Sequence, residues 1–373
     1  MIKLIHFITD TNIGGAGRLL CNQIKNMASS EFDIFVALPC KSALIGELSR
    51  LKCKIIELKY GSDASFDRKS VTEDYKIIKD LCPDIVHSHA SLSSRIAATA
   101  CRVPTRIFTR HCSFPMSNLS KNPLVKALSG AANSLFSTSI LAVSESARCD
   151  LIDSGCDKKR ITTIINGVNP IRTISESEKM YLCERLGIEK GNFTIGIFAR
   201  LEKYKGHKTL LEAAAICKKY YPNFRFLIVG DGTQRGALEE YATRLGVADI
   251  VYFTGFCEDV APLFNIIDLN VNCSFGTETS SLALSEGMSL GIPAVVSDYP
   301  GNTHMVKNAE NGLVFPQNNP RALAMEIIRM YRDRELYEAC RIGAYKRYKE
   351  EFNARAMTEK MLDFYRKEYQ KAH

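Results

Sequence analysis

The sequence predicts an α/β protein with two parallel-sheet domains. Short apolar runs alternate with amphipathic helical patterns along the whole chain, which is typical of stacked βα units. The pattern restarts near the middle, after the turn Asn166-Gly167-Val168, and 373 residues are enough for two domains of ordinary size. The composition, 46% hydrophobic and 24% charged, is that of a globular protein.

The first half is predicted to contain five strands and five helices. The strands are short runs rich in β-branched and aromatic residues: Lys3–Ile8, Ile34–Leu38, Ile85–His87, Arg106–Thr109 and Ile140–Val143. The helices show apolar residues three and four positions apart: Gly17–Ala28, Val71–Leu81, Leu92–Cys101, Pro123–Leu135 and Glu145–Ser154.

The second half repeats this architecture after a strand at Ile161–Ile165. A boundary is expected near Val168–Thr173, because Pro170 interrupts the pattern there. The later strands are predicted at Phe193–Phe198, Phe224–Val229, Ile250–Phe253, Asp268–Asn272 and Ala294–Ser297, and helices at Lys208–Tyr220 and Gly236–Leu245. The last amphipathic helix is predicted over Asn353–Gln370.

The composition also limits the compartment. Thirteen cysteines show no C-x-x-C pair, a pattern that favours free thiols in a reducing environment. The first residues already resemble a strand rather than a signal peptide, and no apolar run approaches the roughly 18 residues of a membrane span. We therefore expect a cytoplasmic protein.

The net charge of +8 is uneven. Residues 1–170 hold 22 Lys and Arg against 15 Asp and Glu, whereas residues 171–373 hold 27 against 26. Arg102, Arg106 and Arg110, with Lys121 and Lys126 nearby, form a basic segment. A solvated surface and a patch attracted to anionic lipid at the inner face of a membrane both fit this segment. Nucleic-acid binding is not expected, since the basic residues are not interleaved with aromatic residues that look exposed and no recognition motif is present.

Two carboxylates eight positions apart, Glu278 and Glu286, form the most informative motif. A helix is predicted to begin near Thr279 and to end at Gly291. Glu278 would then lie at the helix start, beside the unbonded N–H groups of residues 279–281, which would bind an anion. A ligand that carries both phosphate and hydroxyl groups suits this combination. Without a ligand, an acid at a helix start is also simply favourable.

A second motif follows the strand Phe193–Phe198. Arg200 and Lys205 occupy one loop at the carboxyl end of a predicted parallel strand, where open α/β sheets bind ligands. Two such cations could hold a diphosphate, Arg through its fork and Lys as a point charge. A charged surface loop is the alternative.

Together these motifs resemble family 4 retaining glycosyltransferases of the GT-B fold. The resemblance is carried by the Glu-x7-Glu spacing, the segment Gly291–Asp298 after it, Ala199-Arg200-Leu201 and Lys205-Gly206. It implies two Rossmann-like domains facing across a cleft. Residues 1–170 would form the acceptor side, residues 171–352 the nucleotide-sugar domain, and residues 353–373 a helix that crosses back to the first domain.

The resemblance also implies roles for individual residues. Arg200 and Lys205 would stabilise the leaving diphosphate, Glu278 would contact hydroxyls of the donor sugar, and Glu286 would bridge the ribose hydroxyls. The other donor-binding positions implied are Gly14, Gly15, Gly230, Phe256, Thr279, Ser280, Ser281 and Leu282. For Phe256 an ordinary place in the core is the alternative.

Histidines at predicted strand ends form a further group. The resemblance places His111 beside the donor sugar, in a positioning role; a purely structural histidine is the alternative. His87 and His89 form an H-x-H pair, for which an acceptor-side or structural role is expected. Two histidines without a third ligand are a weak metal signal, so no metal is expected.

The expected activity is transfer of a sugar from a nucleoside diphosphate, with UDP as the preferred nucleotide, to a saccharide or lipid-linked saccharide in polysaccharide synthesis. The transfer is expected to retain the configuration at the anomeric carbon and to need no metal or other cofactor. A GT-B epimerase or hydrolase, a non-catalytic partner subunit and a membrane scaffold are the alternatives. Two departures from the family pattern bear on the donor: Thr279-Ser280-Ser281 follows the first Glu, and Gly301-Asn302-Thr303 stands where an acid is common.

Overall fold

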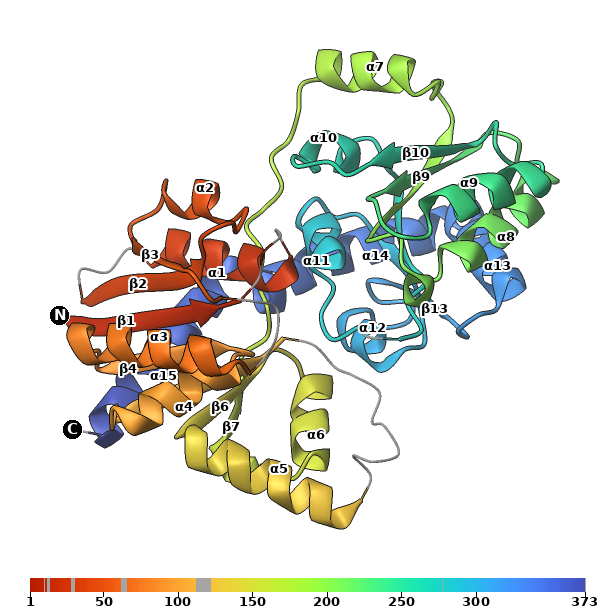
Figure 1. The fold of residues 1–373 in the computed structure, drawn as a ribbon. Coiled ribbons are helices and arrows are strands. Elements are labelled where there is room, and N and C mark those ends of the chain that lie inside the picture. The colour runs from red at the N-terminus through yellow and green to blue at the C-terminus, as the bar shows by residue number, and fades with distance from the viewer. Residues whose placement is uncertain are drawn as a thin grey trace. The chain divides into compact units, whose positions relative to one another are not determined.

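The computed structural model describes residues 1–9, 11, 14–27, 31–61, 66–111, 122–276 and 278–372. The chain forms two compact units (Figure 1). Unit 1 comprises Met1–Val168 together with Ala354–His373, and unit 2 comprises Asn169–Asn353. The structure thus divides the chain within two residues of the predicted boundaries at 170 and 352.

Unit 1 is built on a seven-stranded parallel sheet of order β3-β2-β1-β4-β5-β6-β7. Its strands are β1 (Ile2–Ile8), β2 (Phe32–Pro39), β3 (Lys54–Leu58), β4 (Ile85–His89), β5 (Thr105–Arg110), β6 (Ser139–Ala142) and β7 (Ile161–Thr163). The strand order reverses between β1 and β4. Loops that leave these two strands diverge at their carboxyl ends, which is where open α/β sheets form a crevice.

Several helices of unit 1 begin at residues whose side chains cap them. Ser91, Asn122 and Ser144 each accept a backbone N–H of the first helical turn through the side chain, which satisfies donors that the helix leaves open. The helices are α1 (Gly15–Asn26), α2 (Ile45–Leu48), α3 (Arg68–Leu81), α4 (Leu92–Ala100), α5 (Pro123–Phe136), α6 (Glu145–Asp153), the 3-10 turn η1 (Lys158–Arg160) and α15 (Ala354–Ala372).

Unit 2 contains a six-stranded parallel sheet of order β10-β9-β8-β11-β12-β13. Its strands are β8 (Phe193–Phe198), β9 (Phe224–Val229), β10 (Val251–Gly255), β11 (Leu269–Asn272), β12 (Ala294–Ser297) and β13 (Gly312–Phe315). They are buried on both faces, as their continuous apolar runs predict. Here the order reverses between β8 and β11.

The helices of unit 2 flank this sheet. They are α7 (Glu176–Arg185), the 3-10 turn η2 (Lys203–Lys205), α8 (His207–Lys218), α9 (Arg235–Arg244), α10 (Ala261–Phe264), α11 (Leu282–Ser289), α12 (Pro300–Met305), α13 (Pro320–Arg332), α14 (Arg334–Arg347) and the π-helical turn η3 (Tyr348–Phe352). Helix α7 begins with a capping box in which Ser175 and Glu178 bond each other's backbone N–H groups.

The last helix, α15, returns to unit 1, as the resemblance implied. Figure 1 shows this blue helix among the red and orange elements of the first sheet. The Tyr365 hydroxyl is fully buried; it accepts from Gln23 Nε2 of α1 at 3.0 Å and lies 2.7 Å from His87 Nδ1 of β4. Arg366 adds a forked ion pair with Glu31. The two ends of unit 1 are thus joined by specific polar contacts, buried at Tyr365 and partly exposed at Arg366.

Replacing Tyr365 by Phe is expected to destabilise unit 1 by about 1–3 kcal/mol, because His87 and Gln23 would each lose a buried partner. Denaturant unfolding of the two proteins measures this difference. Tyr60→Phe is the matched control, since Tyr60 is 49% exposed and should change the stability little. Equal effects of the two substitutions would contradict a stabilising role for the buried hydroxyl.

Sequence patterns missed several elements. The short strands β3 and β13 and the helices α7, α13 and α14 were not predicted. Strands of only four or five residues give a weak periodic signal. Among the described residues, none of the helices has the length and apolar character needed to cross a membrane.

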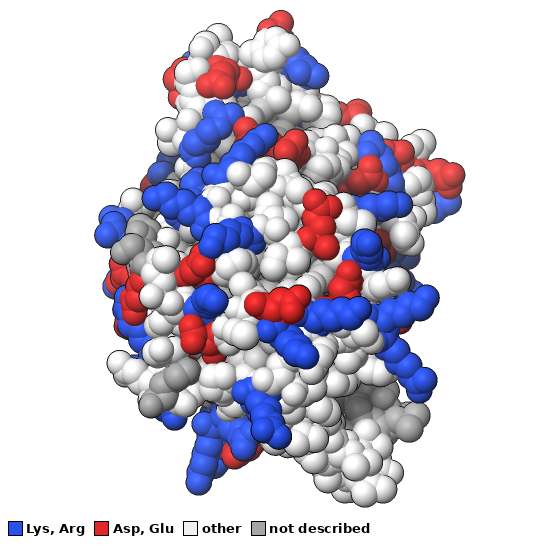
Figure 2. All heavy atoms as spheres, turned by 60° about the vertical axis from the view of Figure 1, so that its left-hand side comes forward, with Lys and Arg blue, Asp and Glu red and all other residues white. Residues whose placement is uncertain are grey.

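The described residues of the predicted basic segment lie at different points on and around β5 and α5. Arg102 lies in the turn before β5, with a φ of +54°, and Arg110 is the last residue of that strand. Arg106 is half-buried and bonds the carbonyl of Val103, and Lys121 lies outside the described residues. Figure 2 shows blue basic side chains interspersed with red acidic ones on one face of the molecule.

Candidate active site

The carboxyl edge of the unit 2 sheet brings four loops together around the reversal of strand order. They follow β8, β9, β11 and β12, and they carry most of the residues predicted to bind the nucleotide sugar. Because β8 and β11 are neighbours, the loop with Arg200 and Lys205 lies beside the loop with Glu278. Residues 73 positions apart in the sequence therefore meet at one point of the sheet.

Lys205 and Glu278 form an ion pair at this point. Lys205 Nζ donates to Glu278 Oε2 at 2.7 Å, and the side chains are only 15% and 9% exposed. The same carboxylate oxygen accepts from Asn272 Nδ2 at 3.3 Å and from Ser274 Oγ at 3.1 Å. The charge of a mostly buried carboxylate is thus compensated by one cation and two neutral donors.

A buried polar network extends this arrangement to β12 and α12. Asn302 Nδ2 donates to Ser297 Oγ at 2.8 Å and to Asn272 Oδ1 at 3.4 Å. Ser297 Oγ donates in turn to the carbonyl of Ser274. The network fixes the orientation of Asn272, which faces Glu278. Asn302, which stands where the family often has an acid, therefore helps to hold Asn272 in place next to Glu278.

Arg200 is exposed and oriented by a neighbouring tyrosine. Its Nη2 donates to the hydroxyl of Tyr204 at 2.8 Å. The carbonyl of Tyr204 accepts from the backbone N–H of Phe275 at 2.9 Å, which joins the loop after β8 to the loop after β11. The guanidinium of Arg200 is therefore held at the surface of the site.

Three glycines allow these loops to touch. At Gly206, whose φ is +74°, a Cβ would lie 2.2 Å from the carbonyl oxygen of Cys273. At Gly230, whose φ is +136°, it would lie 2.1 Å from that of Ala199. At Gly301 it would lie 2.1 Å from that of Glu278. Side chains at these positions would push the loops apart, so the glycine that follows Lys205 is a structural requirement of the site.

Gly206→Ala is expected to destabilise unit 2 more than Gly246→Ala. Both glycines have a left-handed backbone, φ +74° and +68°, but a Cβ at Gly246 would meet nothing within 4 Å. The Gly246 variant therefore measures the backbone cost alone, about 1–2 kcal/mol. The Gly206 variant adds an overlap worth about 1–3 kcal/mol more. Urea unfolding of both variants checks the difference, and equal losses would contradict the close loop contact.

The helix start differs from the prediction. Helix α11 begins at Leu282 rather than near Thr279, and it ends at Ser289. Residues 279–281 precede it: Ser281 is the N-cap and accepts from the N–H of Leu284, while its own N–H contacts Met305 Sδ at 3.1 Å. The prediction of a helix start near Thr279 is therefore wrong by three residues, whereas the anion site predicted at residues 279–281 stays a prediction. The open first turn of α11 starts at Leu282.

The remaining predicted donor residues are spread over the two units. Glu286 lies in the middle of α11 and is half-buried. Gly230 directly follows β9. Phe256 follows β10 with 63% of its surface exposed, which excludes the core position considered for it. Gly14 is the N-cap of α1 and Gly15 its first residue; of the loop before them, residues 10, 12 and 13 lie outside the described residues.

Sequence reasoning missed several residues of this site. Tyr204, Asn272 and Asn302 contact predicted residues directly, yet only the departure at Gly301-Asn302-Thr303 pointed toward one of them. His207, next to the Lys205-Gly206 pair, is buried with both ring nitrogens unpartnered. Burial, and then the charge of Lys205, lowers the pKa of His207 to about 4, so its ring is neutral at pH 7.

In unit 1 the predicted histidines lie together with one that was missed. His87 and His89 occupy β4, His111 directly follows β5, and His6 of β1 joins them; His6, His87 and His89 are buried. Ring nitrogens of these three lie within 4.8 Å of one another. His6 escaped notice because it stands inside an apolar strand, where only the strand pairing reveals its neighbours.

Comparisons with known proteins agree with this architecture. The family model of group 1 glycosyl transferases matches residues 182–347, and that of glycosyltransferase family 4 matches residues 13–172. A putative glycosyltransferase of Bacillus subtilis, EpsD, is 28% identical over 70% of this chain and 71% of its own length. The UDP-Gal:α-D-GlcNAc-diphosphoundecaprenol α-1,3-galactosyltransferase of Escherichia coli is 29% identical over 72% of each chain.

Solved structures show the same fold. Anabaena HepE in complex with UDP-glucose superposes with a TM-score of 0.85 over 98% of this chain and 100% of its own, at 21% identity. A sucrose-phosphate synthase from Thermosynechococcus elongatus gives a TM-score of 0.78 over 98% and 99%. With two parallel-sheet units, a terminal helix that returns to the first, and both family models matched in order, the chain belongs to the family 4, or group 1, glycosyltransferases and has the GT-B fold.

Proposed function

We propose that the chain transfers a sugar from a nucleoside diphosphate, UDP by preference, to a saccharide or lipid-linked saccharide with retention at the anomeric carbon. The observation that carries this proposal is the meeting of Arg200, Lys205 and Glu278 at the switch point of the unit 2 sheet. The choice of UDP as the donor nucleotide is supported by the name of the Anabaena structure, which contains UDP-glucose. The choice of a lipid-linked acceptor is supported by the name of the Escherichia coli relative.

In this proposal the leaving diphosphate contacts Arg200, Lys205 and the open first turn of α11. Cations and helix N–H groups aimed at developing negative charge are the largest source of stabilisation in many transfer reactions. Because Lys205 also binds Glu278, its charge serves both the diphosphate and the carboxylate. These groups would replace a metal ion, so we expect full activity in the presence of EDTA.

Glu278 is proposed to accept hydrogen bonds from hydroxyls of the donor sugar and Glu286 from the ribose. A nucleophilic role for Glu278 would demand a carboxylate close to the anomeric carbon. Its Oε2 already accepts three hydrogen bonds, which favours a binding role over attack. Retention then follows from attack by the acceptor hydroxyl on the face that the phosphate leaves, with its proton passing to that phosphate. His111 is proposed to contact the transferred sugar.

Calorimetric titration with UDP, GDP and ADP tests the nucleotide site. We expect one of them to bind, and Arg200→Ala to weaken binding at least about tenfold, or 1.4 kcal/mol. Arg332→Ala, an exposed arginine at the carboxyl end of α13, is the control and should leave binding unchanged. Binding with hydrolysis or epimerisation but no transfer would favour the alternative enzymes on this fold. Binding without turnover would favour a partner subunit, and no binding would overturn the proposal.

Association with an anionic membrane surface is a further part of the proposal, and α5 supports it. The helix exposes a stripe at positions i, i+4, i+7 and i+11, namely Leu124, Leu128, Ala131 and Leu135; the three leucines are 60–68% exposed. Its inner side packs so closely on the loop after α6 that a Cβ at Gly130 would lie 1.9 Å from the carbonyl oxygen of Gly155. The apolar stripe therefore faces away from the core.

Basic residues flank this stripe. Arg160 Nη1 donates to the carbonyl of Ser134, near the carboxyl end of α5, at 2.8 Å. Two further basic residues, Lys158 and Lys159, directly precede Arg160 in the turn η1. An outward apolar stripe beside basic residues matches the boundary between acyl chains and anionic headgroups. Co-sedimentation with vesicles tests it: the protein should bind vesicles of anionic lipid more than neutral ones. Leu124, Leu128 and Leu135 changed together to Gln should abolish binding, and unchanged binding would contradict this role for α5.

A further inference from the structure

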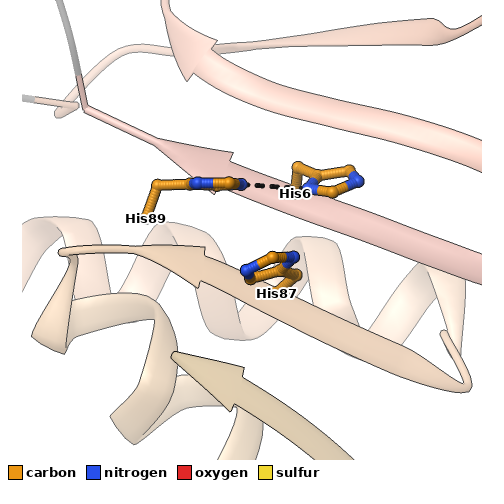
Figure 3. A group of neighbouring side chains, drawn as sticks. All are labelled: His6, His87 and His89. Atoms are coloured by element: carbon orange, nitrogen blue, oxygen red, sulfur yellow. Dashed lines mark hydrogen bonds between the residues drawn. The ribbon is translucent and has the colours of Figure 1, made fainter. Parts of the chain in front are cut away.

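Three histidines of unit 1 lie on β1 and β4, where the order of the sheet reverses, and a fourth follows the neighbouring strand β5. His6 comes from β1, His87 and His89 from the adjacent β4, and His111 follows β5. Figure 3 shows the ring of His89 directed at that of His6, with His87 beneath them. Family membership gives no reason for His6 and His89, which are buried and which the proposed reaction does not use.

Three of these rings form a continuous hydrogen-bonded chain. His6 Nδ1 lies 3.0 Å from His89 Nε2, and His89 Nδ1 lies 2.8 Å from His111 Nε2. His87 belongs to a separate set: its Nδ1 contacts Tyr365 and its Nε2 contacts Thr109 Oγ1 at 2.6 Å. The chain thus leads from the interior of the sheet to its carboxyl edge, where His111 stands.

All three rings of the chain are neutral at pH 7. Burial lowers the pKa of His6 to about 3 and that of His111 to about 4. It also holds the pKa of His89 well below the usual value, with the neighbouring histidines adding to the effect. A neutral imidazole has one N–H and one lone pair, so it donates through one nitrogen and accepts through the other.

It follows that the chain has a single direction. If His6 donates through Nδ1, then His89 accepts at Nε2 and donates through Nδ1, and His111 accepts at Nε2 and carries its proton on Nδ1. In the opposite direction all three protons lie on Nε2. His6 Nε2 decides between the two, because it is buried without a partner. The first direction leaves an unpaired lone pair on Nε2, whereas the second leaves an unpaired N–H there. Buried N–H groups without an acceptor are the rarer of the two, so the first direction is favoured.

A metal site is the competing explanation, since ring nitrogens of His6, His87 and His89 lie within 4.8 Å. Ligating lone pairs lie in the ring planes and must converge on the ion. The rings of His87 and His89 instead stack, with centroids 4.4 Å apart and an angle of 25° between planes. Their in-plane lone pairs run nearly side by side, whereas the hydrogen bonds of the chain account for both nitrogens of His89. The contacts favour the chain.

We propose that His6 and His89 are positioning residues which, through this chain, hold His111 in one orientation and in the tautomer protonated on Nδ1. The inference rests on the proposed contact of His111 with the transferred sugar for its catalytic meaning. The tautomer itself is a property of the protein without substrate. The chain would thereby fix which ring nitrogen of His111 carries the proton, with no change of charge at the site.

The tautomer is measured by long-range ¹H–¹⁵N spectra of protein labelled with ¹⁵N-histidine. The chain has seven histidines, and a His111→Gln sample identifies the signals of His111 by their loss. We expect the Nδ1–H form of His111 in the wild type. A His111 signal of the Nε2–H form, or of averaged tautomers, would overturn the proposal. So would about one equivalent of zinc in the purified protein that His89→Leu removes.

Two substitutions of His89 separate positioning from packing. Asn places an amide near the position of Nδ1 and keeps the bond to His111, whereas Leu fills the space without a polar group. With Leu we expect mixed tautomers of His111 and a kcat lowered at least about tenfold, with the KM for the sugar nucleotide nearly unchanged. With Asn both should return toward the wild type. Equal losses in the two variants, with the tautomer unchanged, would mean a packing role only.

Failure of this inference and of the proposed function give different results. If the purified protein binds no nucleotide and transfers no sugar, the proposed function is overturned, yet the spectra still report whether His6 and His89 fix His111. If transfer is found but His111 is not held in one tautomer, only the positioning role is overturned.

Discussion

Lys205→Met is expected to destabilise unit 2 by about 3–5 kcal/mol, because Glu278 would keep a buried charge without its cation. This is a large part of the 5–15 kcal/mol that usually holds a domain folded. Sugar transfer should fall at least about a hundredfold, since the same cation is proposed to stabilise the diphosphate. Denaturant unfolding and initial-rate kinetics measure the two effects separately.

The double variant Lys205→Met with Glu278→Gln distinguishes the ion pair from simple loss of a side chain. Removing both charges leaves Asn272 and Ser274 with a neutral amide partner, so much of the stability should return while activity stays low. Lys208→Met, at a position where the side chain is 68% exposed, serves as the charge-matched control. If the two single variants simply add in the double variant, the pair is not coupled and the account of Glu278 is wrong.

Lowering the pH from 7 to 5 should destabilise unit 1 by several kcal/mol. The folded pKa values of His6, His87, His89 and His111 lie below the usual 6.5, so the unfolded chain binds more protons than the folded one once the pH falls below about 6.5. By pH 5 this costs about 2 kcal/mol for each ring that stays neutral. The loss continues until the folded rings titrate, near pH 4 for His111 and pH 3 for His6.

Asp74 acts in the opposite direction. Burial, and then the nearby charge of Glu73, raises its pKa to about 8, so acidification favours the folded state. Between pH 7 and pH 5 this gain in stability offsets roughly the loss that one neutral histidine causes.

Hydrogen exchange at pH 7, 6 and 5, corrected for the intrinsic rate, reports the free energy of opening for β1 and β4 separately from unit 2. His111→Gln should lose about 2 kcal/mol less than the wild type. A constant opening free energy would mean that the histidines are not kept neutral.

The sequence was informative where chemistry and local pattern coincide. Alternating apolar runs predicted both parallel sheets, because strands covered on both faces need continuous apolar sequences. Arg200, Lys205 and Glu278 stood at strand ends, and strand ends of a parallel sheet share one edge. Their grouping followed from topology once the strands were recognised. Their roles in binding and catalysis stay predictions.

The failures come from contacts between distant segments. Propensity placed the start of α11 near Thr279, but Gly301 and Met305 pack against residues 278–281 and delay the helix to Leu282. The periodicity of α5 predicted a helix, yet it did not show that Leu124 and Leu128 face outward. Neither feature has a local signal, because each depends on which element packs against the segment.

The return of α15 has a consequence for synthesis of the protein. Unit 1 contains residues from both sides of Asn169–Asn353, so the ribosome completes the whole of unit 2 before it makes the helix that carries Tyr365. At 5–20 residues per second this delay lasts roughly 10 to 40 s. Unit 2, which is continuous in sequence, can complete its core first. During that interval the first 168 residues expose the surface that α15 later covers, which makes them a natural client for chaperones.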